Sequence, residues 1–483
     1  MRPPVITILG HVDHGKTTLL DYIRKSNITD QEHGGITQKI GAYEITTSFN
    51  DYKTNKITFI DTPGHKAFAK LRSRGANVAD IAILLIDGKD SVMPQTIESI
   101  YHIKNAKIPF IVAINKIDLP EVNIEKVKND LLKYEVLVEG KGGKIPVCPI
   151  SAKTGQGVKE LLETILFIAS ELNIQYDINS PVEAYIIETK KDRRGIVVSS
   201  IIKNGRIKVG DVLYNNEKKI KVRSLINDQG KSINEVVPSM PFEILGFDFL
   251  PEVGTIITSE IKTQGQKEDT NKINQQKSNF SLEAILETPK QEKKLSIIIK
   301  TDSQGSLEAI EESIKNIPNI EIALKAVGEI SKSDVFLAKT TKSIILGFNT
   351  KANLEAENLA KQEKIIIKTY NIIYELLDEI SEVASLLKEK EEKEKNLKGE
   401  AKILATFIIE KETVYGVKVT KGKINLDDPI EIYRDNKLIG KTKLISLKIR
   451  AKSVNEVKKD QEAGMMFYPL LDIKVGDVVK SIL

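Results

Sequence analysis

The sequence predicts a multidomain protein that combines α/β and all-β parts: an α/β domain, a β-barrel, a small α/β domain, a connecting helix and a C-terminal β-barrel. Length is the first observation behind this prediction, because 483 residues are too many for one compact core. The second is a block of wholly apolar runs that alternate with helical patterns. The third is the recurrence of short strands with turn signals further along the chain.

Residues 1–175 are expected to form a doubly wound α/β domain. Its strands should be parallel and covered on both faces, because each run is apolar throughout rather than alternating. The expected strands lie at 5–9, 57–61, 81–87, 109–115 and 145–150, with helical patterns between them, for example at 16–26 and 158–172.

Short strands and Gly-containing turns predict a β-barrel over 180–261. Residues 262–292 are expected to be a linker, since their first part holds a single apolar residue, Ile273. Alternation of strand and helix patterns returns over 293–370 and predicts the small α/β domain.

Residues 371–397 have apolar side chains at helical spacing, followed by a charged end, and are expected to form the connecting helix. Pairs of Glu and Lys four residues apart favour a solvated helix over the alternative, a disordered linker. These pairs are Glu389–Lys393, Glu391–Lys395 and Glu394–Lys398. Strands recur over 398–483 and predict the C-terminal barrel.

Composition excludes some classes of protein. The 41% of hydrophobic and 29% of charged residues are ordinary for a globular chain, and the net charge of +5 argues only weakly for a nucleic-acid partner. Cys148 is the single cysteine, so no intrachain disulfide can form and a buried core residue is expected. No apolar stretch is long enough for a membrane span or a signal peptide. A cytoplasmic protein, or one of an organellar stroma or matrix, is therefore expected.

Residues 10–17 read GHVDHGKT, follow an apolar strand and open a helical pattern, which is the context of a phosphate-binding loop. Gly10 and Gly15 allow backbone N–H groups to approach phosphates at the helix N-terminus. The Lys16 ammonium can reach the β- and γ-phosphates, and the Thr17 hydroxyl can ligate Mg²⁺. The alternative is a structural turn that binds no ligand, and the other motifs of the sequence decide between the two interpretations.

Three further motifs follow strands of the same predicted sheet. Asp61 stands where a Mg²⁺-organising carboxylate belongs, although Asp-Thr-Pro-Gly is also ordinary turn chemistry. Asp118 can accept hydrogen bonds from N1–H and the 2-amino group of guanine, which adenine cannot offer. A backbone N–H within Ser151–Lys153 can meet the guanine O6.

Ligands of open α/β sheets bind at the carboxyl ends of the strands, so the motifs together predict a site for GTP or GDP with Mg²⁺. The predicted contacts are Gly10, His11, Val12, Asp13, His14, Gly15, Lys16, Thr17, Thr18, Asp61, Thr62, Pro63, Gly64, His65, Asn115, Lys116, Ile117, Asp118, Ser151, Ala152 and Lys153.

These motifs resemble the translational GTPases, and the chain is similar to bacterial-type translation initiation factor two. GHVDHGKT, GGITQKIGAY, DTPGH, SVMPQT and NKID have the order and spacing of that family's P-loop GTPase (G) domain. VPSMPFEILGF, KTDSQGSLEAI, IYRDNKLIG and IKVGD extend the resemblance over essentially the whole chain.

The resemblance assigns roles to single residues. Thr37 would bind Mg²⁺ and sense the γ-phosphate, so that Thr17, Thr37 and Asp61 are the expected metal ligands. His65 would be the catalytic residue that positions the attacking water, rather than an exposed turn histidine. Val12 and Ile36 would restrain this histidine until a ribosome rearranges the site.

The implied function is that of an initiation factor, which recruits initiator formylmethionyl-tRNA to the 30S subunit, promotes joining of the 50S subunit and hydrolyses GTP when the ribosome activates it. Partners would be the ribosome, its rRNA and the initiator tRNA, with the factor a monomer and no membrane involved. The alternative is an elongation-type GTPase that carries a specialised aminoacyl-tRNA. Such carriers usually read Arg-Gly-Ile-Thr at the switch and have a second barrel directly after the first, whereas this chain has Gly34-Gly35-Ile36-Thr37.

Two other classes remain as competitors. A metabolic P-loop kinase leaves NKID and the Ser-Ala-Lys motif unexplained. An RNA-binding scaffold would use the basic run 441–459, whose seven Lys or Arg stand against one acid, Glu456. That run is equally well explained as a solvated barrel face.

The resemblance also places tRNA-docking loops in the last barrel, with Val417, Lys448, Arg450, Lys452 and Gly464 as expected contacts. Cysteines expected near positions 417 and 463 and an arginine expected near 449 are absent, which predicts weaker or less formyl-selective binding. Apolar residues of these loops are expected either to wall a formylmethionine pocket or to fill the core: Val417, Met465, Met466 and Phe467.

Overall fold

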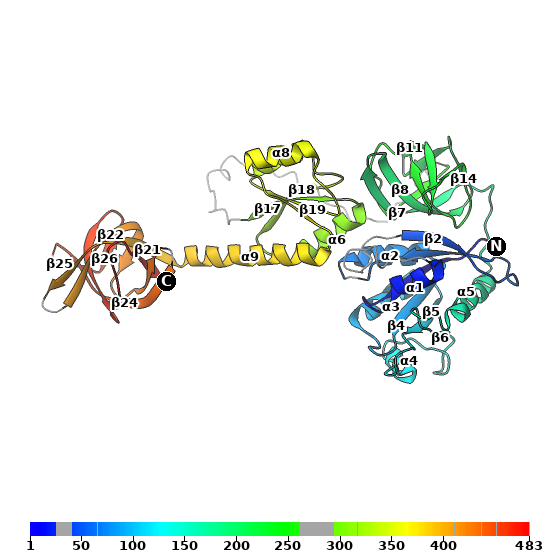
Figure 1. The fold of residues 1–483 in the computed structure, drawn as a ribbon, viewed down its shortest axis with the longest axis horizontal. Coiled ribbons are helices and arrows are strands. Elements are labelled where there is room, and N and C mark those ends of the chain that lie inside the picture. The colour runs from blue at the N-terminus through cyan, green and yellow to red at the C-terminus, as the bar shows by residue number, and fades with distance from the viewer. Residues whose placement is uncertain are drawn as a thin grey trace, which may run out of the picture. The chain divides into compact units, whose positions relative to one another are not determined.

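The structure is a computed structural model that describes residues 1–25, 41–64, 66–260, 294–315, 317–409, 412–435, 437–450 and 452–482. The described residues form two compact units (Figure 1). The first comprises the residues up to 260 together with 295–380, and the second comprises 381–482.

The first unit begins with a six-stranded sheet of order β2-β3-β1-β4-β5-β6. Its pairings are parallel except for β2 with β3, which is antiparallel. Strands β1 and β4 are buried at every residue, as their wholly apolar runs predict. The strands are β1 Val5–Gly10, β2 Gly41–Thr46, β3 Lys56–Asp61, β4 Ile81–Asp87, β5 Phe110–Asn115 and β6 Val147–Pro149.

Helices cover both faces of this sheet, each through its own apolar cluster. Leu19 of α1 and Leu166 of α5 pack with Phe59 on one face. On the other, Ile103 of α3 and Leu131 of α4 pack with β4 and β5. The helices are α1 Lys16–Arg24, α2 Ala69–Val78, α3 Pro94–Ala106, α4 Ile124–Leu132 and α5 Val158–Leu172. This is the doubly wound α/β arrangement of a P-loop GTPase.

A β-rich part follows, whose strands wrap around one apolar core (Figure 1). Eight strands form a sheet of order β11-β10-β16-β7-β8-β15-β12-β13, and β9 pairs with β14. The strands are β7 Glu183–Asp192, β8 Gly195–Asn204, β9 Ile207–Lys208, β10 Val212–Asn215, β11 Lys218–Lys221, β12 Ser224–Asn227, β13 Ser232–Ile233, β14 Glu235–Val236, β15 Pro241–Leu245 and β16 Ile256–Thr258.

The small α/β part has a parallel four-stranded sheet of order β18-β17-β19-β20. Helix α6 starts at a regular N-cap, where the Ser303 side chain accepts a hydrogen bond from the N–H of Ser306. The elements are β17 Leu295–Thr301, α6 Gln304–Ile314, β18 Ile320–Val327, α7 Lys332–Thr341, β19 Ile344–Phe348, α8 Leu354–Glu363 and β20 Ile367–Tyr370.

One apolar cluster joins the three parts of the first unit. Phe68 and Leu71 enter it from the G domain, Ile187 from β7, Ile310 from α6 and Ile373 from the start of α9. Each of these side chains is buried. The nucleotide domain, the β-rich part and the small α/β part therefore share a core, which ties their positions to one another.

The second unit contains the later residues of helix α9 Ile373–Lys395 and a closed barrel. Strands β21-β28-β23-β24-β27-β22 form the ring, and the pairing of β21 with β22 closes it. Its strands are β21 Leu397–Ile409, β22 Glu412–Asn425, β23 Pro429–Arg434, β24 Lys437–Ile449, β25 Lys452–Ser453, β26 Glu456–Lys458, β27 Glu462–Tyr468 and β28 Val478–Ile482. This confirms the expected β-barrel fold at the C-terminal end.

Several local expectations can be compared with the structure. The expected linker, 262–292, lies outside the described residues, as does one side chain of each expected Glu–Lys pair. Lys398, expected at the end of the connecting helix, instead lies in β21, where its Nζ is 2.9 Å from Asp428 Oδ1. Cys148 is buried as expected. No helix in the described part of the chain combines the length and apolarity that a membrane crossing requires.

Candidate functional site

The phosphate-binding loop connects β1 to α1, and two of its residues must be glycine. Gly15 has a left-handed φ of 91°, and a Cβ there would lie 2.4 Å from Asn115 Nδ2. A Cβ on Gly10 would lie 2.3 Å from the carbonyl oxygen of Leu85. Because side chains cannot fit at either position, the loop packs directly against β4 and β5 and leaves its backbone available to a ligand.

Lys16 is a buried cation at the centre of this loop. Its Nζ donates to the carbonyl oxygens of Gly10, at 3.0 Å, and His11, at 2.5 Å. Burial lowers the pKa of Lys16 to about 8, and Asp61 opposes this shift. A phosphate beside the ammonium would favour its charged form, so the lysine is suited to bind an anion.

The turn after β3 lies against the loop. A Cβ on Gly64 would be 2.6 Å from Lys16 Nζ and 3.1 Å from Val12 Cγ2, so this turn touches both residues. Asp61 is buried at the end of β3, where Tyr43 donates to its Oδ2 at 3.3 Å. Thr62 is buried too and donates through Oγ1 to the Ile8 carbonyl. Its hydroxyl therefore bonds to the backbone of β1.

The motifs predicted to recognise the base meet at the ends of β5 and β6. Asn115 Nδ2 donates to the His14 carbonyl and its Oδ1 accepts from the Ala152 N–H, both at 2.8 Å. The Ser151 hydroxyl donates to Asp118 Oδ1 at 2.7 Å. The structure thus brings together residues from the phosphate loop, NKID and Ser-Ala-Lys motifs, which lie far apart in the sequence.

Two residues of this site were missed by sequence reasoning. Asp87 ends β4 and pairs with Lys116, whose Nζ is 2.6 Å from its Oδ2. Burial opposes ionisation of Asp87, but the hydrogen bonds from Lys116 and from the Lys89 N–H, together with the charge of Lys116, outweigh it and lower the pKa of the carboxyl. Gln95 accepts a hydrogen bond from the Val12 N–H at 2.9 Å. Gln95 belongs to the segment SVMPQT, whose resemblance to the family was a signal for it, although no role could be assigned to Gln95 from the motif alone.

The loop histidines differ in their surroundings. Burial lowers the pKa of His14 to about 4, so its ring is neutral at physiological pH. Its Nδ1 accepts a hydrogen bond from the Asp87 N–H at 3.2 Å. His11 is half-buried, and burial also lowers its pKa. His14 is therefore placed to support the sheet rather than to transfer protons.

The remaining predicted contacts lie on the rim of the site or outside the described residues. Asp13, Thr18, Asp118 and Lys153 are exposed, whereas Pro63 and Gly64 are buried. Thr17, Lys116 and Ile117 are half-buried. Thr37, Ile36 and His65 lie outside the described residues, so their expected roles stay predictions.

The residues present suit a nucleotide and its metal ion. Gly10 and Gly15 let the loop backbone pack against Leu85 and Asn115, next to the positive end of α1. Thr17 and Asp61 would supply hydroxyl and carboxylate oxygens, which Mg²⁺ prefers. In the described ranges no cluster of three or more His, Cys, Asp or Glu gathers as a metal site.

The C-terminal barrel brings together the expected tRNA contacts from three strands. Gly464 of β27 pairs with Gly416, next to Val417 on β22, and with Lys448 of β24. Lys448, Arg450 and Lys452 are exposed. Val417, Met465 and Phe467, however, are buried in the barrel core, with Phe467 stacked near Tyr415. These three side chains therefore fill the core, and only Met466 of the expected pocket walls is half-exposed.

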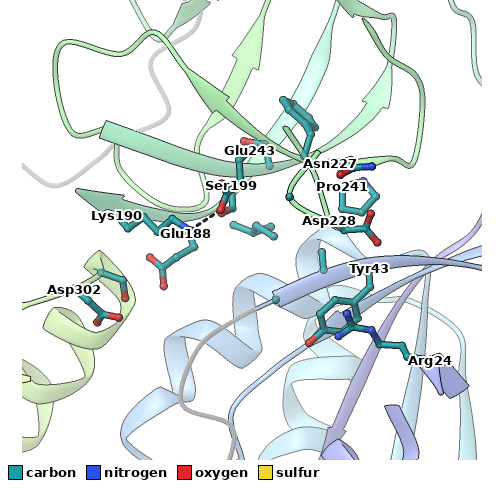
Figure 2. A pocket seen from close by; sticks show the side chains of 17 residues that line it. Arg24, Tyr43, Glu188, Lys190, Ser199, Asn227, Asp228, Pro241, Glu243 and Asp302 are labelled. Atoms are coloured by element: carbon teal, nitrogen blue, oxygen red, sulfur yellow. Dashed lines mark hydrogen bonds and ion pairs between the residues drawn. The ribbon is translucent and has the colours of Figure 1, made fainter. Parts of the chain in front are cut away.

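A cavity of about 340 Å³ lies where the three parts of the first unit meet (Figure 2). Tyr43 borders it from the G domain, Glu188 and Glu243 from the β-rich part, and Asp302 from the small α/β part. Glu188 Oε1 accepts hydrogen bonds from the backbone N–H groups of Thr189 and Gly305. Burial raises the pKa of Glu188 to about 7.

Glu188→Gln should change how the stability of the first unit depends on pH. The folded protein holds the Glu188 proton more tightly than the unfolded chain does, so protonation of Glu188 stabilises the fold. This stabilisation is fully present below the ordinary pKa of 4.5 and is lost as pH rises through about 7. At full burial the difference approaches roughly 3 kcal/mol. Calorimetry should therefore find the variant close to the wild type at pH 5 but with the higher unfolding temperature at pH 8.

Glu243→Gln is the matched control, since Glu243 lines the same cavity but already pairs with Lys190. If the unfolding temperatures of Glu188→Gln and the wild type differ by the same amount at pH 5 and pH 8, Glu188 does not have the raised pKa assigned to it.

Three family models match the chain, in the order of its parts. Residues 2–171 match the Elongation factor Tu GTP binding domain, and residues 181–260 match Elongation factor G domain 2. Residues 270–381 match Translation-initiation factor 2. This last match covers the region in which an elongation-type carrier would have a second barrel.

Curated relatives match over almost the whole chain. Translation initiation factor IF-2 of Bartonella tribocorum is 43% identical, over 99% of this chain and 58% of that protein. The protein of the same name from Thermosipho africanus is 42% identical, over 99% of this chain and 70% of that protein. A solved structure of GDP-bound aIF5B from Aeropyrum pernix is 25% identical, with a TM-score of 0.47, over 100% of this chain and 92% of that one. The chain spans little more than half the length of the Bartonella relative. On its sequence relatives, the chain belongs to the translation initiation factor IF-2 family.

Proposed function

We propose that this protein is an initiation GTPase, which binds GTP, brings initiator formylmethionyl-tRNA to the 30S subunit and promotes joining of the 50S subunit. One observation carries the nucleotide part of the proposal. Polar residues of separate motifs converge at the carboxyl ends of β1, β3, β5 and β6, where Asn115 bonds to both the phosphate loop and Ala152. The relatives' name supports the role in initiation. We expect a monomer that acts in the cytoplasm.

The geometry assigns a task to each part of the nucleotide site. The loop 10–17 and Lys16 would hold the phosphates, with Asp118 and the Ala152 region on the base. Ser151 would fix the Asp118 carboxylate through their 2.7 Å hydrogen bond. Bound Mg²⁺ would neutralise charge on the phosphates, held by Thr17, Thr37 and Asp61.

Hydrolysis would depend on the turn that follows Asp61. His65 would orient the water that attacks the γ-phosphorus, and Val12 would restrain this histidine in the absence of a ribosome. The closeness of the Val12 side chain to Gly64 supports this arrangement, because Gly64 immediately precedes His65. Activation would then require a rearrangement of the turn rather than new chemical groups.

Subunit joining tests the proposal most broadly. Light scattering should show faster joining of 50S to 30S subunits that carry initiator tRNA when the protein and GTP are added. GDP should support joining poorly. Joining that is equally fast without the protein, or with ATP in place of GTP, would refute the proposed role.

The C-terminal barrel would bind the aminoacyl end of initiator tRNA through the exposed cations Lys448, Arg450 and Lys452. We expect the intact protein to slow hydrolysis of the aminoacyl ester, with weaker preference for the formylated form than is usual in the family. Burial of Val417 supports this, because it leaves fewer side chains for a formylmethionine pocket. Strong discrimination in favour of formylated tRNA would contradict the expected loss of selectivity, and absence of any protection would contradict the docking assignment.

Helix α9 would act as a rigid spacer, since its 23 residues correspond to about 34 Å at 1.5 Å per residue. Inserting Gly-Pro near Lys390 should break the helix and uncouple tRNA protection from subunit joining. Inserting Ala-Ala at the same place is the matched control, because it keeps the helix intact. Joining at the full rate with the broken helix would count against a spacer.

A further inference from the structure

Helix α3 touches both sides of the nucleotide site through two residues one turn apart. Gln95 accepts a hydrogen bond from the Val12 N–H of the phosphate loop at 2.9 Å. Glu98, three residues later on the same face, lies 2.5 Å from Nη2 of Arg72 in α2. The helix therefore contacts the loop directly and the turn after β3 through Arg72.

Arg72 is fully buried, which is rare for a cation. Its Nη1 donates to the carbonyl oxygens of Pro63 and Gly64, each at 3.0 Å. The planar guanidinium can serve the two carbonyls and the Glu98 carboxylate at once, because its N–H groups point in fixed, different directions. The ammonium group of a lysine has no such fixed, planar arrangement of donors.

Glu98 is held as an anion opposite this cation. Burial opposes its ionisation, but hydrogen bonds to His102, at 3.3 Å, and to Arg72 lower the pKa of Glu98. An ion pair with one fully buried and one partly buried partner contributes little net stability once desolvation is counted. The Arg72–Glu98 pair is therefore better explained by the segment that it holds in place than by a gain in stability.

What it holds is the turn that carries the predicted water-positioning histidine. A Cβ on Gly64 would lie 2.6 Å from Lys16 Nζ and 3.1 Å from Val12 Cγ2, so the turn lies directly beside both side chains, and His65 is the next residue. A closed circuit results, from α3 through Gln95 to Val12, across to Gly64, and back through Arg72 and Glu98. Movement of the turn would have to break a charge-assisted bond inside the protein.

We infer that Arg72 is a positioning residue for GTP hydrolysis, which fixes the 63–64 peptide relative to the phosphate loop by anchoring it to α3. This inference rests on the proposed GTPase function. Arg72 would act through the Pro63 and Gly64 carbonyls that it holds, so its loss should affect turnover more than nucleotide affinity. Misplacement of a catalytic group by about 1 Å costs up to about 100-fold in rate.

Arg72→Lys tests the inference, measured as ribosome-stimulated kcat for GTP beside the Kd for GDP and the unfolding temperature. We expect kcat to fall about 10- to 100-fold, with the Kd for GDP essentially unchanged. Glu98→Gln keeps the acceptor and the shape but removes the charge, and should give a smaller loss. The double variant should be no slower than Arg72→Lys alone, because the two residues act as one unit.

Arg74→Lys is the matched control, since Arg74 lies on the same helix and pairs with Glu308 of α6, away from the turn. It should keep the wild-type kcat. Wild-type turnover in Arg72→Lys would overturn the inference, as would a parallel loss of kcat and GDP affinity. If Arg72→Lys does not fold, Glu98→Gln decides in the same way. A wild-type protein without ribosome-stimulated turnover would instead refute the proposed function.

Discussion

Replacing Asp118 by asparagine should weaken GTP binding by about 100- to 1,000-fold and improve binding of xanthosine triphosphate. The carboxylate is the proposed acceptor for two donors of guanine, and an amide at this position presents a donor where an acceptor is needed. Loss of such matched contacts costs several kcal/mol, because buried donors are left unpaired. Xanthine carries a 2-oxo group instead of the 2-amino group, so the asparagine NH₂ regains a partner there.

Equilibrium titration with fluorescent nucleotides measures both effects. Asp130→Asn is the matched control, since Asp130 also accepts a hydrogen bond from a serine hydroxyl, Ser91 at 2.8 Å, but lies outside the predicted base site. It should leave both affinities unchanged. Unchanged GTP affinity in Asp118→Asn would remove Asp118 from the base site.

His65→Ala should nearly abolish GTP hydrolysis while it preserves GTP binding and subunit joining. The proposed role of His65 is to orient the attacking water, an interaction that counts in the transition state and not in the ground state. The expected signature is therefore a large loss of kcat with an unchanged Kd for GTP. Rapid-mixing measurement of phosphate release on ribosomes, beside light scattering for joining, separates the two.

Lys66→Ala is the control for this prediction, because Lys66 is the neighbouring residue and its side chain is exposed. It should hydrolyse GTP as the wild type does. A His65→Ala protein that loses nucleotide affinity but keeps its turnover would show that His65 is structural.

Elements with a strong local pattern could be predicted from the sequence. The strand 81–87 and the helix 158–172 appear with the expected bounds, because a wholly apolar run and a 3.6-residue period are local signals. Strands β2 and β18 were missed. Both carry polar residues at alternate positions, and β18 is half-buried to exposed along almost its whole length. They join a sheet by pairing with another strand, and the local sequence pattern does not indicate which strand that is.

The site follows the same rule. The Gly10–Thr17 loop and the NKID motif are contiguous, so their chemistry can be read from the sequence. Asp87, Gln95 and Arg72 bond to residues that are distant in the sequence and become neighbours only in the folded protein. Val417 shows the converse, since an apolar residue in a predicted loop fits a pocket wall and a core equally well until its burial is known.

GTP hydrolysis with and without assembled ribosomes tests the central claim most directly. The protein alone should turn over GTP slowly, ribosomes should accelerate it strongly, and ATP should not replace GTP. This follows from a site proposed to bind guanine, in which contacts within the protein hold the turn proposed to position the attacking water. Hydrolysis that ribosomes do not stimulate, or that proceeds equally with ATP, would contradict the account.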